Sequence, residues 1–289
     1  MILFVFEGEK TEPLLYSSMK KLFLPKENVD IICSYKSNIY SLYEKMTHNG
    51  YFDDVRTDVS LVPLLQEHIK AQGDFEHPLL KIKNRDEVSQ IFLFFDYDCQ
   101  NKTTNGCYCL KENNERIRDL LEFFDDETSS GKLYINYPMI ESIRYTKKLP
   151  DLKFNCYTVA LDECPDKVFK NKVHRFSFYK NFDFLTLSFL YKVQAAFKLP
   201  DVKLRKTKLR SFWKRRNEIK RNWKLLVRQN VEKLFNITNS DPETIANHFA
   251  ITQRSLFDFQ LQNFVSNGEV SIICSIPLFL YDYIPASQW

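Results

Sequence analysis

Three carboxylates follow two strongly apolar segments of the chain. Residues 1–6 form an apolar run that ends at Glu7, and residues 91–95 form a second run that ends at Asp96 and Asp98. Ligands of open α/β sheets bind outside the carboxyl ends of the strands, so two buried parallel strands would bring these acids into one crevice. Crowded carboxylates repel one another unless a cation holds them, and hard divalent cations prefer oxygen ligands. The spacing therefore predicts a Mg²⁺-type metal site.

The neighbours of these acids suit phosphate chemistry. Gly8 permits a sharp turn and the close approach of a phosphate. Lys10 and the first N–H groups of the following helix supply positive charge near that phosphate. In an extended strand the side chains of Asp96 and Asp98 point to one face, so both can ligate one ion or bridge two. Two hard cations about 3.5–4 Å apart would stabilise the attacking and leaving oxygens of phosphodiester cleavage.

The order of predicted elements indicates an α/β fold. Strand and helix patterns alternate through the first half of the chain, which predicts a parallel sheet flanked by crossover helices. The first strand is apolar throughout, as expected of a strand covered on both faces. The predicted strands are 1–6, 29–34, 91–95 and 133–136, and the predicted helices are 11–22, 38–47, 59–72 and 112–124.

Three short motifs resemble those of a known family. Residues 7–12 read E-G-E-K-T-E, residues 96–98 read D-Y-D, and residues 137–141 read Y-P-M-I-E. Over residues 1–150 the chain thereby resembles the Toprim domain, most closely the small nucleases of the OLD, RloB and AriB-like group of bacterial defence systems.

The resemblance implies roles for five acids and a cofactor. Asp96 and Asp98 would bind metal, Glu7 would be a ligand or a general acid/base, and Glu141 and Glu12 would be supporting ligands. The cofactor would be Mg²⁺ or Mn²⁺, as two ions. The resemblance also implies that a partner ATPase or another defence-system protein is common.

Each of these acids also has a plain structural interpretation. Glu12 is favourably placed as an acid in the first turn of a helix, and Glu141 is explained equally simply as a helix cap. Glu9 is expected to face solvent. Asp96 and Asp98 taken singly are typical loop or capping carboxylates, so it is their combination with Glu7 that favours metal chemistry.

The second half of the chain differs in charge and in pattern. Residues 1–150 carry 19 Lys/Arg and 24 Asp/Glu, a net charge of −5, whereas residues 151–289 carry 22 and 13, a net charge of +9. We therefore expect a Toprim-like catalytic domain over 1–150 and a basic, mainly helical domain over 151–289. Helices are predicted over 182–198, 203–235, 241–250 and 253–264, and a buried C-terminal element over 270–284.

A strongly basic helix lies within that second half. Residues 203–228 contain twelve Lys/Arg and one acid, Glu218. Such a face would follow nucleic-acid phosphates with an affinity that falls steeply with salt, and it has no evident base-reading code. A buried stripe is expected to include Leu204, Leu209, Phe212, Ile219 and Trp223. The predicted nucleic-acid contacts are Lys10, Lys203, Arg205, Lys206, Lys208, Arg210, Lys214, Arg215, Arg216, Lys220 and Arg221. Binding to a membrane surface is a weaker alternative.

Composition excludes several other classes. The chain has 289 residues, 44% hydrophobic, which suffices for a sizeable core. Seven cysteines without a zinc-type spacing, Cys107 and Cys109 among them, indicate a reducing, cytoplasmic setting. No apolar run reaches the roughly 18–20 residues of a membrane span. With six glycines there is no G-x-G-x-x-G or G-x-x-x-x-G-K phosphate loop, and no G-x-S-x-G serine elbow.

The sequence thus predicts a metal-dependent endonuclease that cleaves DNA or RNA, tRNA included, and the resemblance implies a role as an anti-phage defence effector. The main alternative is a non-catalytic nucleic-acid-binding or partner-regulating subunit on a Toprim scaffold. A D-x-D phosphotransferase or glycosyltransferase is disfavoured by the missing phosphate loop, and a primase- or topoisomerase-like enzyme by the short chain without a zinc ribbon. The sequence leaves open whether the substrate is DNA or RNA and whether cleavage is sequence-specific. It also leaves open the activation trigger, the partner, the oligomeric state and the role of the Cys107/Cys109 loop.

Overall fold

A computed structural model describes the chain except for residues 25–28, 53–59, 100–108, 188–198, 239–251 and 285–289. Five strands form one sheet in the order β2-β1-β3-β5-β4. Their bounds are Ile2–Phe6 for β1, Asp30–Ser34 for β2, Gln90–Asp96 for β3, Asp125–Asp126 for β4 and Gly131–Asn136 for β5. The pairs β1–β2, β1–β3 and β3–β5 are parallel, and the short β4 is antiparallel to β5. The predicted parallel α/β sheet is therefore confirmed.

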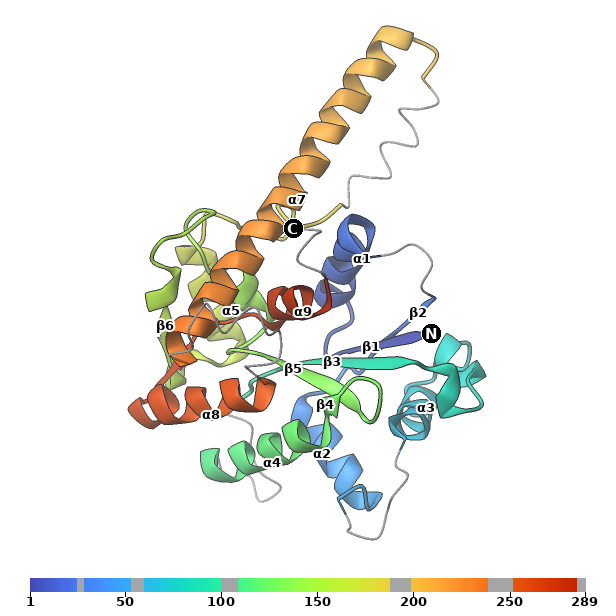
Figure 1. Cartoon of the computed structure of the whole chain (residues 1–289), viewed down its shortest axis with the longest axis vertical. Helices are drawn as coiled ribbons and strands as arrows, with labels where there is room; N and C mark the ends of the chain where they lie inside the picture. The colour runs from blue at the N-terminus through green and yellow to red at the C-terminus, as the bar shows by residue number, and fades with distance from the viewer. Residues whose placement is uncertain (25–28, 53–59, 100–108, 188–198, 239–251, 285–289) are drawn as a thin grey trace.

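Helices cover both faces of this sheet (Figure 1). In the first half they are α1 Thr11–Phe23, α2 Ile39–His48, α3 Leu61–Ala71 and α4 Leu110–Phe123. In the second half they are α5 Asp166–Phe176, α7 Val202–Thr238, α8 Gln253–Asn263 and α9 Ser275–Tyr283. α1 and α9 lie on one face, and α2, α3 and α4 lie on the other. Each of the four helices predicted in the first half is present within a few residues of its predicted bounds.

Aromatic side chains fix α1 and α9 to the sheet. Successive residues of a strand point to opposite faces, so Phe4 of β1 and Phe94 of β3 face the same side. Tyr16 of α1 lies 4.2 Å from the ring of Phe4, and Phe279 of α9 lies 5.4 Å from the ring of Phe94. Because α9 belongs to the last part of the chain, one hydrophobic core spans both halves. The division at residue 150 stays a prediction.

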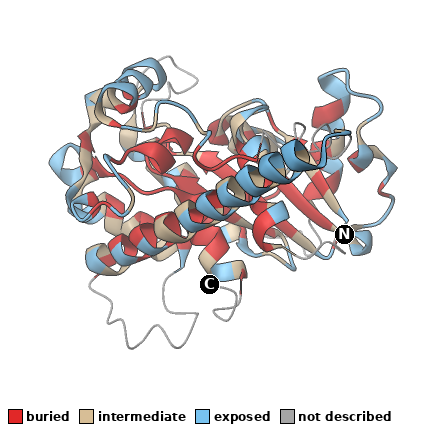
Figure 2. Cartoon of the chain, turned by 90° about the horizontal axis from the view of Figure 1, so that it is seen from above, coloured by how far each residue is buried: buried red, intermediate tan, exposed pale blue. Residues whose placement is uncertain are grey.

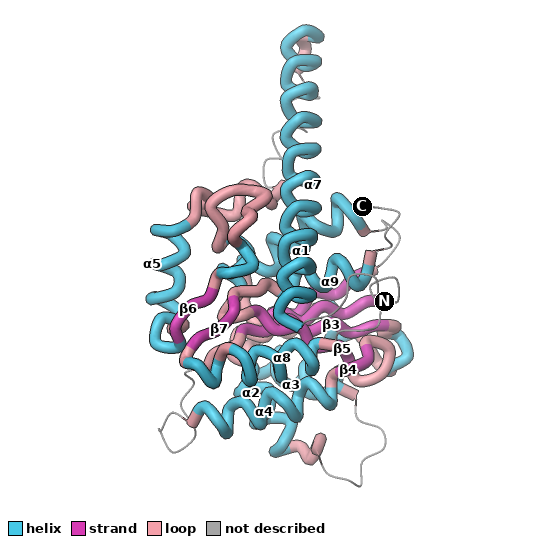
Figure 3. The backbone as a smooth tube through the Cα atoms, turned by 60° about the vertical axis from the view of Figure 1, so that its left-hand side comes forward, coloured by secondary structure: helices cyan, strands magenta, loops and turns pink. Residues whose placement is uncertain are grey.

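The region after residue 150 is mainly helical, as predicted, with two short additions. β6 (Thr158–Ala160) and β7 (Glu269–Ser271) form a two-stranded antiparallel sheet beside α5 (Figure 3). The predicted element over 270–284 is buried and consists of β7 and α9. Among the described helices, none is both long and apolar enough to cross a membrane.

The helix predicted over 182–198 is wrong where the structure describes it, at 182–187. These residues form turns because their backbone groups bind other elements. The carbonyls of Phe184 and Leu185 accept hydrogen bonds from Asn222 and Trp223 of α7 at 2.9 Å. Residues 188–198, and the helix predicted over 241–250, lie outside the described residues.

Candidate functional site

The ends of β1 and β3 lie side by side, as predicted. In their parallel register Phe6 pairs with Phe94. The N–H of Glu7 donates to the carbonyl of Phe94 at 3.0 Å. Two residues beyond Phe94, the N–H of Asp96 donates to Oε2 of Glu7 at 2.9 Å. β1 connects to β2 on one side and pairs with β3 on the other, so these acids occupy the switch point where open α/β sheets bind ligands.

Glu12, from the first turn of α1, turns back toward this edge. Its side chain is buried, and its Oε1 accepts the N–H of Gly8 at 3.1 Å. A Cβ atom at Gly8 would lie 2.7 Å from Oε2 of Glu12, closer than real contacts allow. Glycine is therefore what lets this carboxylate approach the turn.

Glu141 approaches from the other side of the edge. It lies in the 3₁₀ helix η3 (Ile140–Arg144) and is 7% exposed. The ammonium of Lys170 on α5 lies 3.7 Å from its Oε1. Its Oε2 is buried and has no hydrogen-bond partner among the described residues. One oxygen of Glu141 is thus available to a further ligand.

Asn136, the last residue of β5, connects the acids to α9. Its Nδ2 donates to Oδ1 of Asp96 at 2.9 Å. Its Oδ1 accepts hydrogen bonds from both the N–H and the hydroxyl of Ser275, at 3.0 and 2.8 Å, and from the thiol of Cys274 at 3.3 Å. This buried amide fixes the orientation of Asp96.

Burial and mutual repulsion raise the pKa values of the acids. Burial first, and then, against a lowering by the N–H of Asp96, the charges of Glu12 and Asp98 raise the pKa of Glu7 to about 8. Burial, followed by the charges of Glu7, Glu12 and Glu141, raises the pKa of Asp96 well above its usual range. Burial also raises the pKa values of Glu12 and Glu141, while Lys170 acts in the opposite direction on both. Within the described part of the chain, the site lacks the positive charge needed to ionise all of its acids.

Asp98 departs from the prediction that the D-x-D segment is extended. β3 ends at Asp96, and the N–H of Asp98 donates back to the carbonyl of Asp96 at 3.1 Å. This bond across one residue turns the chain at Tyr97, whose buried ring packs 5.7 Å from that of Tyr137. The two aspartates therefore do not project from one strand face, although the charge of Asp98 still acts on Glu7.

The donor atoms of these acids suit a hard cation better than the arrangement of their side chains does. Among the described residues, no three His, Cys, Asp or Glu side chains are arranged to hold a metal ion together. The donors are nevertheless carboxylate oxygens, the preferred ligands of Mg²⁺, and their pKa values are raised by burial and by one another's charges. The unpartnered oxygen of Glu141 is consistent with a missing ligand. The donor set thus fits a divalent cation.

Sequence reasoning missed Asn136 and Lys170. A polar residue closing a predicted core strand is a signal that could have found Asn136. Lys170 gave no local signal, because its position beside Glu141 depends on how α5 packs. Glu9 faces solvent as predicted and pairs with Lys36 at 2.7 Å. Lys10 is exposed next to it.

The predicted basic helix is α7, and its first half projects from the body of the protein (Figures 1 and 3). The long helix in Figure 2 is mostly exposed along the projecting half, whereas the other half has buried, intermediate and exposed residues. All ten predicted contacts between 203 and 221 are exposed or partly exposed. Of the predicted stripe, Ile219 and Trp223 are buried, but Leu204 is 44% exposed. Leu209 and Phe212 are only partly buried, because this half of α7 extends past the sheet.

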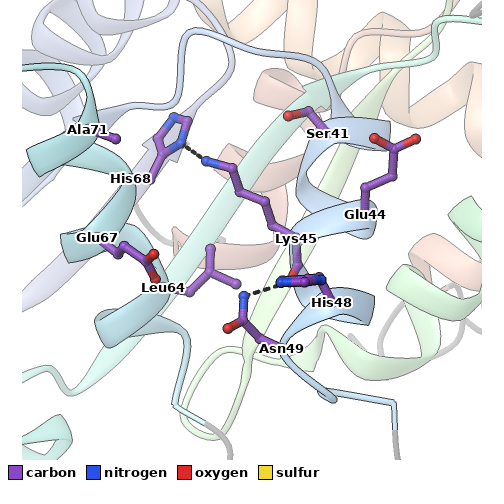
Figure 4. Close-up of a pocket in the computed structure, with 9 residues that line it drawn as sticks. All are labelled: Ser41, Glu44, Lys45, His48, Asn49, Leu64, Glu67, His68 and Ala71. Atoms are coloured by element: carbon purple, nitrogen blue, oxygen red, sulfur yellow. Dashed lines mark hydrogen bonds between the residues drawn. The ribbon is translucent and has the colours of Figure 1, made fainter. Parts of the chain in front are cut away.

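A separate cavity of about 410 Å³ lies between α2 and α3 (Figure 4). The ammonium of Lys45 reaches across it to Nδ1 of His68, whose ring stacks on Tyr35. Burial lowers the pKa values of both Lys45 and His68. None of the predicted site acids lines this cavity, so it is distinct from the sheet edge.

Comparison of the chain with protein-family models, curated proteins and solved structures finds no match.

Proposed function

We propose that the protein is a metal-dependent endonuclease whose centre is the acidic edge of the sheet. The observation that supports this most is the contact between the ends of β1 and β3. There Glu7 accepts the N–H of Asp96 in a set of half-buried and buried acids with raised pKa values. A buried group of acids is costly to ionise without cations, so its presence at a ligand-binding edge favours a catalytic use.

In this proposal Asp96 and Glu7 hold Mg²⁺ or Mn²⁺, with Asp98, Glu12 and Glu141 as further ligands. The bound cations would supply Lewis-acid stabilisation of a phosphodiester during its cleavage. Asn136 keeps Asp96 oriented through its amide nitrogen.

Glu7 and Lys170 supply chemistry of their own. Oε2 of Glu7 is engaged by the N–H of Asp96, so Oε1, ionised when a cation is bound, is the oxygen that would contact that cation. Lys170, beside Glu141, would bring a positive charge to a phosphate at the mouth of the site.

We further propose that the exposed cations of α7 bind the nucleic-acid substrate. Ten Lys/Arg lie along residues 203–221, with Glu218 as the one acid, and Arg215 pairs with it at 2.9 Å. Such a one-signed surface fits a polyanion, and phosphates carry the sequence-independent part of nucleic-acid binding. A role as an anti-phage effector of the Toprim type, with an ATPase or other protein partner, belongs to the same proposal and rests on the motif resemblance.

Cleavage by the purified full chain tests the proposal. Labelled single- and double-stranded DNA and RNA are incubated with Mg²⁺, with Mn²⁺ or with EDTA. We expect cleavage only with metal, and a loss of at least roughly 100-fold in Glu7→Gln and Asp96→Asn. Glu9→Gln is the matched control, because Glu9 is exposed and paired with Lys36.

Unchanged cleavage in both site variants would reject the site. Binding of the oligonucleotides without metal-dependent cleavage would favour the alternative of a non-catalytic binding subunit. Thermal unfolding of each variant checks that the fold is retained.

A further inference from the structure

Two loops near α5 expose large apolar side chains. Phe178, just after α5, is 75% exposed, and Leu152 is 86% exposed. A singly exposed apolar side chain is ordinary on a protein surface, so the character of this region depends on what surrounds these two residues. We call residues 146–153 and 176–180 together the Phe178 surface.

Hydrogen bonds tie the Phe178 surface to the segment that carries Glu141. Arg144, in the same 3₁₀ helix as Glu141, donates from its Nη1 to the carbonyl of Lys180 at 2.6 Å. The hydroxyl of Ser177 donates to the carbonyl of Thr146 at 3.0 Å. The two loops are therefore held to each other and to the edge of the acidic site.

The exposed polar residues of this surface are basic. Its exposed cations are Lys147, Lys148, Lys153 and Lys180, and Arg175 precedes it on α5. The ammonium of Lys147 lies 5.1 Å from the ring of Phe176. Its acid, Asp151, is buried and accepts the N–H groups of Lys147 and Lys153, so that its charge is used within the loop. The surface combines an exposed aromatic ring with several cations.

A second exposed phenylalanine, Phe75, shows that an exposed ring is not always accompanied by cations. Phe75 is 73% exposed, but its neighbours in the chain are the acids Asp74 and Glu76. Phe75 lies between α3 and the 3₁₀ helix Pro78–Lys81, on a different part of the fold. It offers a ring of the same kind in surroundings that repel phosphates.

We propose that the Phe178 surface binds an unpaired nucleotide and so selects single-stranded segments for the acidic site. The base would stack on the ring of Phe178, and the flanking phosphates would contact Lys147 and Lys180. Stacking requires an accessible base face, which a paired base inside a duplex does not offer. The identity of the ligand rests on the proposed nuclease function, whereas the surface itself is defined by its contacts and charge.

The test measures binding in EDTA, so it does not depend on catalysis. Fluorescence anisotropy compares a labelled single strand with the duplex of the same sequence, for wild type, Phe178→Ala and Phe75→Ala. We expect Phe178→Ala to weaken single-strand binding roughly 5- to 100-fold and duplex binding less than about twofold. Phe178→Trp should restore single-strand binding, and Phe75→Ala should match wild type.

Equal single-strand affinity in Phe178→Ala and Phe75→Ala overturns the proposal, as does an equal loss for single strand and duplex. Sedimentation with vesicles of phosphatidylcholine and phosphatidylserine tests a membrane surface as the occupant. A loss of vesicle binding in Phe178→Ala, with oligonucleotide binding unchanged, also overturns it. If the strand preference depends on Phe178 but no variant or condition gives cleavage, the nuclease proposal fails and this one stands.

Discussion

At the end of β1, Glu7 is held where its ionised form is disfavoured. Its ordinary pKa of 4.5 is raised to about 8, first by burial and then, against the N–H of Asp96, by the charges of Glu12 and Asp98. A bound cation would reverse this balance by favouring the ionised form. The protonation of Glu7 is therefore linked both to folding and to metal binding.

This linkage predicts how stability depends on pH without metal. Between about pH 4.5 and 8 the folded chain keeps a proton on Glu7 that the unfolded chain has lost, so the free energy of unfolding falls as pH rises. Glu7→Gln should show a shallower fall and be more stable by about 1–3 kcal/mol near pH 7. Mg²⁺ should raise the melting temperature of wild type at pH 8 more than that of the variant. Urea unfolding in EDTA from pH 5 to 8 measures the effect.

Glu9→Gln serves as the control, because Glu9 is exposed and its pKa is lowered by its hydrogen bond with Lys36. That variant should keep the wild-type pH profile. A Glu7→Gln profile that overlays the wild-type profile would contradict the assignment.

At the scale of elements, Asn136 joins three parts of the fold. It ends β5, orients Asp96 at the end of β3, and accepts two hydrogen bonds from Ser275 at the start of α9. Because the amide is 1% exposed, water cannot replace these bonds if the side chain is removed.

Asn136→Ala is therefore expected to lower the free energy of unfolding by about 2–4 kcal/mol, from the buried donors that it leaves unpaired. The matched control is Asn267→Ala, whose amide makes one exposed bond to the carbonyl of Asn263 and should change stability by less than about 0.5 kcal/mol. Urea denaturation of both variants at pH 7 gives the comparison. A loss in Asn136→Ala no larger than in the control would show that the three-way contact contributes nothing.

The elements were predictable where local pattern decides them. The buried runs at β1 and β3 and the amphipathic helices α2 and α4 follow from periodicity, and so does the meeting of Glu7 with Asp96. The turn at Tyr97 was not predictable, because it depends on the buried contact between Tyr97 and Tyr137. The non-helical backbone at 184–187 likewise depends on distant partners on α7.

At the scale of the whole molecule, the sequence separates an acidic half from a basic half, but packing does not. α9 lies on the sheet of the first half, and Lys170 of α5 completes the surroundings of Glu141. Neither contact could be predicted from the sequence. Each joins segments that are far apart in the chain, and the pattern of one segment does not specify its partner. The charge asymmetry is instead expressed in the projecting half of α7.

That half of α7 predicts a salt-dependent affinity. Replacing Lys206, Lys208 and Arg210 by Gln should weaken oligonucleotide binding at low salt. It should also lower the slope of log affinity against log salt by about 2–3. The control replaces Lys81, Lys83 and Lys111, which are equally exposed on other elements. Anisotropy titrations from 50 to 300 mM salt give both slopes, and equal slopes in the two triple variants would place the phosphate contacts elsewhere.

α7 also has a mechanical consequence. Its 37 residues form a stiff rod about 55 Å long, exposed at one end and partly buried at the other. At the partly buried end Asn230 accepts the N–H of Cys274, the residue before Ser275, and Ser275 leads through Asn136 to Asp96. A movement of this end of α7 that shifted Asn230 relative to α9 would strain a linkage that finishes at Asp96.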